Sequence, residues 1–165
     1  MPAGFPDIAA ELSQIAEEAA TLGRAVEVDL GAAGLTSREA DWLFTQGLAA
    51  GVENVYSGCE RVMVLLAKTV DGEPVAKDDG WHRALLGRLA QPRLGGRGPV
   101  ITAELFHALD ELRSFRHRRR NTYGLQLDRD KVVERARMAA PTVARFGAEV
   151  EAFLKEWPRT ARPED

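Results

Sequence analysis

Residues 129–157 read RDKVVERARMAAPTVARFGAEVEAFLKEW, and apolar residues recur through this stretch every three or four positions. That spacing places them on one face of an α-helix. Asp128 precedes the stretch as a candidate N-cap, and Pro141 should kink or restart the helix. A seam this long needs other helices to cover it. Its members are Val132, Ala136, Ala139, Val143, Phe146, Val150 and Phe153.

The same spacing predicts three further helices earlier in the chain. The first runs over residues 7–26 with Asp7 as its N-cap, and the second spans residues 37–70 behind a Thr36–Glu39 capping box. The next follows Thr102, which we expect to cap it. Its expected buried stripe consists of Leu105, Leu109, Leu112 and Phe115.

A shorter helix is expected from Trp81 to near Pro92, and no segment shows the alternation of a strand. The predicted fold is therefore all-α, an antiparallel helical bundle of four long helices and one short helix. Gly47, Gly51 and Gly58 each cost about 1 kcal/mol of helix propensity relative to alanine, so we expect another helix to approach them closely. Residues 92–99 are rich in glycine and are predicted to be a flexible connection.

The chain has 165 residues, of which 45% are hydrophobic and 28% charged, and a formal net charge of −3. These values predict one domain over residues 1–165, with a core at about 7–157 and a frayed tail at 158–165. The negative charge excludes an overall basic protein, so nucleic acid would need a local patch. A single cysteine excludes an internal disulfide. Without a signal segment or a long apolar run, we expect a cytoplasmic protein with no membrane association.

A basic patch lies at residues 112–124, which read LRSFRHRRRNTYG. One interpretation is that cations at a helix C-terminus complement the helix dipole and face water. The other is that they bind an anion. If the stretch is helical, it carries two neighbouring polar stripes. One consists of Arg116, Arg120 and Tyr123, and the other of Arg113, His117 and Asn121.

Metal and cofactor sites are not expected, because the chain lacks Cys-x-x-Cys and His-Glu-x-x-His patterns and its three histidines are scattered. We expect Cys59 to be a buried structural thiol, His107 to lie at the surface, and His82 to pack on Trp81. Arginine and histidine suffice for RNA cleavage without metal. A base deprotonates the ribose 2′-OH, which attacks the neighbouring phosphorus, while the guanidinium stabilises the phosphorane.

Residues 116–123, RHRRRNTY, resemble the Arg-x4-6-His signature of the HEPN superfamily and, more narrowly, the Arg-x4-His-x-Tyr motif of HepT-type ribonuclease toxins. Residues 81–86, WHRALL, and 112–123 together resemble a HepT-like subgroup, and the resemblance extends over about 36–153. It implies a helical bundle that forms a homodimer with a composite cleft and cuts RNA without a cofactor. It also implies a nucleotidyltransferase antitoxin as partner, which would transfer AMP to Tyr123.

The resemblance implies that Arg116 acts on the scissile phosphate, with His117 and Asn121 as the other catalytic candidates. The implied substrate-binding residues are Arg113, Arg119 and Arg120. The chain departs from the motif at Asn121, which replaces its histidine and cannot carry a proton. Either His117 transfers the proton, or the protein binds without cutting.

Three functions therefore stay open. The first is a dimeric endoribonuclease toxin. The second is a non-catalytic HEPN module that docks a nucleotidyltransferase or binds nucleotide or RNA. The third is a structural or adaptor bundle whose arginines bind an acidic partner.

Overall fold

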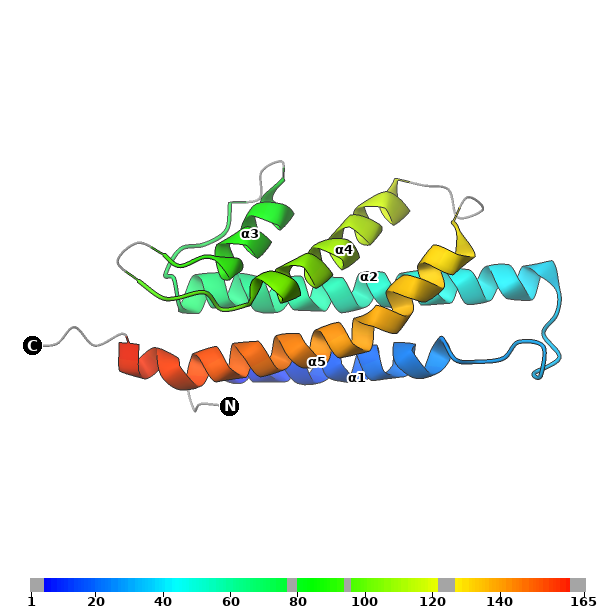
Figure 1. Ribbon diagram of the computed structural model, residues 1–165, viewed down its shortest axis with the longest axis horizontal. Helices are drawn as coiled ribbons and strands as arrows, with labels where there is room; N and C mark the ends of the chain where they lie inside the picture. Colours follow the sequence, from blue (N-terminus) through cyan, green and yellow to red (C-terminus); the bar gives the residue numbers. More distant parts are fainter. Residues whose placement is uncertain (1–4, 77–79, 94–95, 122–126, 161–165) are drawn as a thin grey trace, which may run out of the picture.

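The computed structural model describes residues 5–76, 80–93, 96–121 and 127–160. These residues form helices and no strand, so the predicted all-α fold is confirmed. Figure 1 shows α1, α2 and α5 side by side along the long axis, with α3 and α4 packed on α2. α1 and α4 run opposite to α2 and α5. The helices are α1 (Pro6–Ala25), α2 (Arg38–Thr69), α3 (Trp81–Ala90), α4 (Ala103–Arg120) and α5 (Arg129–Thr160).

The predicted caps of α4 and α5 are confirmed. Thr102 Oγ1 accepts a hydrogen bond from the amide of Leu105 at 3.3 Å, and Asp128 Oδ1 accepts one from the amide of Asp130 at 3.1 Å. Each side chain thereby satisfies an amide that has no partner within the helix.

The predicted starts of α1 and α2 were wrong by one or two residues. α1 begins at Pro6 with Phe5 as N-cap, because proline has no amide hydrogen to leave unpaired at the first helical position. Asp7 instead lies in the first turn, where its charge favours the helix dipole. α2 is capped by Ser37 rather than Thr36, since Ser37 Oγ accepts a hydrogen bond from the Ala40 amide at 3.1 Å.

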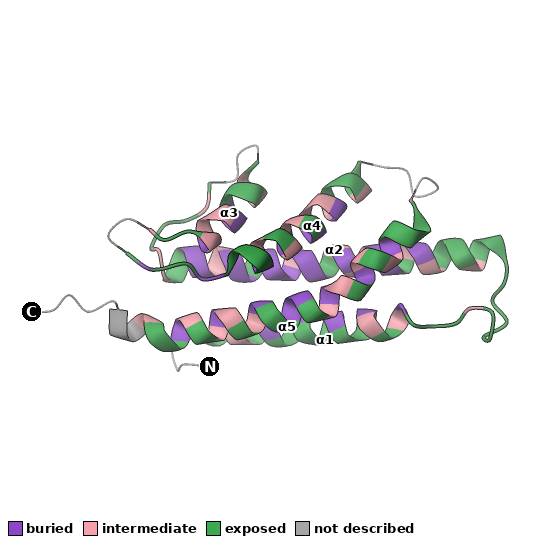
Figure 2. Ribbon diagram, viewed as in Figure 1, coloured by how far each residue is buried: buried purple, intermediate pink, exposed green. Residues whose placement is uncertain are grey.

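The buried side chains of all five helices form one cluster, which lies along the inner faces coloured purple in Figure 2. The predicted stripe of α4 is fully confirmed. The predicted seam of α5 is confirmed up to Val150, but Leu154 rather than Phe153 completes it, because the helical repeat drifts away from a strict heptad. Phe153 is half-buried and stacks on Trp157.

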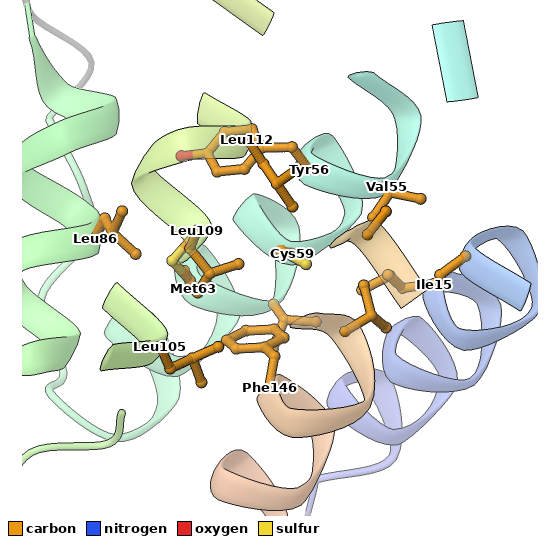
Figure 3. Close-up of a cluster of buried hydrophobic side chains, with 14 of the residues drawn as sticks. Ile15, Val55, Tyr56, Cys59, Met63, Leu86, Leu105, Leu109, Leu112 and Phe146 are labelled. Carbon is orange, nitrogen blue, oxygen red and sulfur yellow. The ribbon is translucent and has the colours of Figure 1, made fainter. Parts of the chain in front are cut away.

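Figure 3 shows the centre of this core, where Phe146 lies among side chains from α1, α2 and α4. Cys59 is fully buried there, as expected, and burial raises the pKa of its thiol to about 12. Tyr56 is also buried in this cluster. Its hydroxyl has no hydrogen-bond partner among the described residues.

Two of the three glycines in α2 permit a close approach of α1. A Cβ at Gly58 would lie 2.5 Å from Cγ1 of Ile15, and one at Gly51 would lie 2.8 Å from Cδ1 of Leu22. The same expectation was wrong for Gly47, which has nothing within 4 Å of that position. α1 and α2 are therefore joined through small residues over part of their length only.

α5 is one continuous helix, so Pro141 does not restart it. Figure 1 shows that its yellow first part runs obliquely to its orange and red remainder. A proline inside a helix removes one backbone hydrogen bond and favours such a bend. The helical backbone reaches Thr160, past the expected end at Trp157.

Residues 92–99 were predicted to be a flexible connection, but Arg97 within them is packed, with its side chain 2% exposed. Its guanidinium binds the carboxylate of Asp71 and the carbonyl oxygens of Arg88, Gln91 and Gly98. These bonds attach the connection to the end of α2. Within the residues described, no helix is both long and apolar enough to cross a membrane.

Candidate functional site

The last two turns of α4 carry the basic residues that the sequence singled out, from Arg113 to Arg120. Arginine is a good helix former, and cations at a helix C-terminus interact favourably with its dipole, so the local sequence favours a helix up to Arg120. α4 packs against both α2 and α3, so this end of the helix has two sides. Arg116 and Arg119 face α2, where they meet Glu60 and Glu53, whereas His117 and Arg120 are exposed.

A groove of about 410 Å³ separates this end of α4 from the beginning of α3. Ligand sites in proteins commonly have volumes of about 300–1,000 Å³. The described members of both polar stripes expected on α4 therefore border a common space. α3 adds His82, which the sequence analysis had not grouped with the basic helix end. The lining residues are His82, Arg113, Arg116, His117, Arg120 and Asn121.

Arg116 is the most enclosed guanidinium of this groove, with 15% of its side chain exposed. Its Nη1 lies 3.6 Å from Oε2 of Glu60, and its Cζ lies 6.0 Å from the centre of the Tyr56 ring. At 3.6 Å the charges attract but no hydrogen bond forms. Charge and the aromatic face thus orient the guanidinium, while its donors have no hydrogen-bond partner among the described residues.

Glu60 was missed by the sequence analysis. It lies on α2 within an otherwise apolar face, where Tyr56 and Met63 are fully buried, and only 8% of Glu60 is exposed. A carboxylate inside an apolar helical stripe was the available signal, because a buried charge needs a partner. Together with burial, which is the larger cause, Glu60 raises the pKa of the Tyr56 hydroxyl, which therefore stays protonated.

His82 packs on Trp81 as expected, with the two ring centres 3.9 Å apart. Gly80 precedes them at φ 83°, a conformation that favours glycine, and places both residues in the first turn of α3. The structure adds a contact that the sequence did not reveal, because Nδ1 of His82 meets Oε2 of Glu60. Glu60 therefore joins His82 from α3 to Arg116 from α4.

His117 and Asn121 both lie in the groove and are exposed. Asn121 is the C-cap of α4, and its Nδ2 donates a hydrogen bond to the carbonyl oxygen of His117 at 2.9 Å. The imidazole of His117 has no hydrogen-bond or ion-pair partner among the described side chains. His117 is thus free to turn toward a bound molecule, whereas the amide of Asn121 serves the helix end.

The three expected substrate-binding arginines lie in different surroundings. Arg120 is exposed in the groove, and Arg113 borders it while its Nε binds Asp110 Oδ1 at 2.6 Å. Arg119 lies outside this groove, forms an ion pair with Glu53, and borders a separate cavity against α5. The structure brings together two of the three.

Tyr123, the expected modification site, lies outside the described residues. His107 is exposed on α4, as expected. Among the residues described, no group of three or more His, Cys, Asp or Glu side chains could hold a metal ion.

Comparison with known proteins supplies the family. A sequence model of the family described as HepT-like protein matches residues 47–157, which include α3, α4, most of α2 and the groove. Searches of curated proteins and of solved structures gave no significant match. The match covers well over half of the chain and agrees with its all-helical fold, so the chain belongs to the HepT-like family and, through it, to the HEPN superfamily.

Proposed function

We propose that this protein is a metal-independent endoribonuclease of the toxin type that cuts RNA in the groove between α3 and α4. One observation carries the proposal: the guanidinium of Arg116, whose donors have no hydrogen-bond partner in the described part of the chain, lines the same groove as the imidazoles of His82 and His117. Family membership supports the same conclusion at a coarser level. Guanidinium and imidazole are the groups that this reaction needs.

The proposed reaction transfers a phosphoryl group within the RNA, from the 5′-oxygen of one nucleotide to the 2′-oxygen of the nucleotide before it. The 2′-oxygen loses its proton to a base and forms a bond to the adjacent phosphorus, and the bond from phosphorus to the 5′-oxygen breaks. A proton delivered to that oxygen completes the leaving group, so the products are a 2′,3′-cyclic phosphate and a 5′-hydroxyl. Arg116 would hold the non-bridging oxygens, whose negative charge grows in the transition state.

The remaining cations of the groove suit the approach of an RNA strand. Arg120 is exposed, and Arg113 borders the same groove about two helical turns earlier on α4. Contacts of this kind neutralise backbone phosphates and position the strand without reading its sequence. We therefore assign substrate binding to Arg113 and Arg120. Arg119 pairs with Glu53 outside the groove, so we assign it no direct contact with RNA.

We further propose a homodimer with two such grooves and a nucleotidyltransferase partner that modifies Tyr123. Support for these proposals is the motif resemblance and the family. An added AMP would bring a bulky anion close to the arginines of α4 and compete with RNA for them. Sedimentation of the purified protein tests the dimer. Intact mass after incubation with a co-encoded nucleotidyltransferase and ATP, compared between wild type and Tyr123→Phe, tests the modification.

A non-catalytic RNA- or nucleotide-binding module is the second candidate. The observation that favours it is Asn121, which stands at the motif histidine and uses its side chain to cap α4. Such a module would bind RNA in the groove and leave it intact.

The deciding experiment incubates the purified protein with RNA in the presence of EDTA. We expect cleavage with 2′,3′-cyclic phosphate ends, and a loss of about 100-fold or more in Arg116→Ala. Arg137→Ala is the matched control, because Arg137 is an exposed arginine on α5 that pairs with Glu27. Intact RNA after binding would establish the module, and cleavage by Arg116→Ala at the wild-type rate would contradict this site.

A further inference from the structure

Glu60 is an uncommon feature for the centre of a helical bundle. Its carboxylate is carried by α2, the helix whose other inward side chains build the apolar core, and it is buried. Burying a charge is costly unless partners compensate. Among the described residues, Glu60 pairs with His82 on α3 and with Arg116 on α4, so its partners come from two other helices. Both partners border the groove.

The contact with Glu60 determines which nitrogen of His82 carries the proton in the neutral ring. A carboxylate accepts hydrogen bonds, so Nδ1 must be the donor and Nε2 keeps the lone pair. Nε2 has no hydrogen-bond partner among the described residues. The side chain is 32% exposed, and the ring stacks on Trp81, which limits its rotation. An oriented imidazole with a free lone pair is the form that accepts a proton.

We propose that His82 is the general base of the RNA cleavage assigned above and that Glu60 is its positioning residue. This inference rests on the proposed function. Asn121 cannot accept the proton, and His117 has no side-chain partner among the described residues that would select its tautomer. Of the two imidazoles that line the groove in the described part of the chain, His82 is the one that combines access, a defined tautomer and a carboxylate that can stabilise the imidazolium once it forms.

The proposed cleavage step involves two proton transfers. Nε2 of His82 takes the proton of the 2′-hydroxyl as the 2′-oxygen bonds to phosphorus. The 5′-oxygen leaves and takes a proton from His117 in its imidazolium form, which faces the same groove. Arg116 stabilises the phosphorane, and Glu60 balances the charge that His82 gains. Among the described residues, Glu60 from α2 contacts His82, and the charged or titratable groups that line the groove with it are Arg113, Arg116, His117 and Arg120 from α4.

Kinetics with His82→Ala test the catalytic part. We expect kcat to fall by about 100-fold or more, with binding of a 2′-O-methyl RNA and the thermal midpoint close to wild type. Added imidazole should restore part of the rate. His107→Ala, an exposed histidine of the same fold away from the groove, should match wild type. If His82→Ala folds poorly, His82→Gln serves as a second variant, because glutamine is closer in size to histidine and cannot act as a base.

Glu60→Gln tests positioning. It keeps the shape of Glu60 but removes its charge, so we expect kcat to fall about tenfold while KM stays within twofold. Long-range ¹H–¹⁵N NMR spectra supply a readout independent of activity. Wild-type His82 should be protonated at Nδ1 when neutral, and Glu60→Gln should show a mixture of tautomers.

The outcomes separate the two proposals. An inactive wild-type protein would overturn the proposed function and this inference with it. An active wild type together with a fully active His82→Ala, or a His82 protonated at Nε2, would overturn only the inference and return the base to His117.

Discussion

The guanidinium of Arg97 lies against the carboxylate of Asp71, with Nε 2.7 Å from Oδ1 and both side chains almost completely removed from solvent. Arg88 and Arg93 contact the same carboxylate from α3 and from the connection that follows it. Asp71 thus joins the end of α2 to α3 and to the 92–99 connection. This arrangement supports α3, which carries His82 to the groove.

Replacing Asp71 with alanine should therefore destabilise the protein by about 3 kcal/mol or more, because Arg97 would be left buried without its counter-charge. Glu73→Ala is the matched control. Glu73 binds Arg93 in the same cluster but is 59% exposed, so its loss should cost less than about 1 kcal/mol. Urea unfolding of both variants measures the difference, and equal destabilisation would contradict a special role for the buried pair.

The pKa of Asp71 should also make the stability of the protein depend on pH. Burial alone would raise the pKa of Asp71, but hydrogen bonds from Arg97 and Arg88 outweigh it and hold that pKa below its ordinary value. A carboxyl with a lower pKa in the folded state stabilises the fold above its unfolded-state pKa, about 3.9, and loses this contribution as the pH falls through the folded-state pKa. The free energy of unfolding should drop below about pH 4, and less steeply in Asp71→Asn. Parallel curves would exclude Asp71 as the cause.

Gly58→Ala should destabilise the protein by about 1–3 kcal/mol, although alanine is the better helix former. The added methyl group would lie 2.5 Å from Cγ1 of Ile15 and force α1 away from α2. For Gly47→Ala on the same helix we expect the opposite change in stability. Nothing lies within 4 Å of its new methyl group, so stability should rise by up to about 1 kcal/mol. Thermal unfolding of the two variants should give shifts of opposite sign.

Arg120 and Arg119 are neighbours in sequence but should differ in their effect on RNA. Arg120 lies exposed in the groove, so Arg120→Ala should weaken binding and reduce the salt dependence of log K by about one unit. Arg119 is tied to Glu53, so Arg119→Ala should lower stability and leave the salt dependence unchanged. Titrations of a 2′-O-methyl RNA at several salt concentrations decide between them. A smaller slope in Arg119→Ala would place RNA on the other side of α4.

Cys59 should resist thiol reagents in the native protein. It is fully buried, and burial raises the pKa of its thiol to about 12, so almost none is present as the reactive thiolate at neutral pH. Reaction with a chromogenic disulfide should be slow in buffer and rapid in denaturing urea. Fast modification of the folded protein would show that this part of the core opens.

The helices could be predicted from local patterns because each pattern has a local cause. Thr102 and Asp128 cap the helices that follow them, and the stripes of α4 and α5 follow the helical repeat. The errors occurred where two local solutions compete. Thr36 and Ser37 both offer a hydroxyl, and Phe153 and Leu154 both lie near the end of the seam. The sequence pattern does not separate such neighbours, because both hydroxyls are suitable N-caps and the helical repeat drifts away from a strict heptad.

The candidate site likewise combines features that the sequence predicts with features that only packing determines. The basic turn of α4, its two polar stripes and the family resemblance are all present in the order of residues 112–124. The grouping of Glu60, His82 and Arg116 depends on how α2, α3 and α4 pack, because these residues are far apart along the chain and meet only through side chains of three helices. The separation of Arg119 from Arg120 likewise depends on Glu53. Periodicity acts within a helix, whereas charge pairing and burial act between helices.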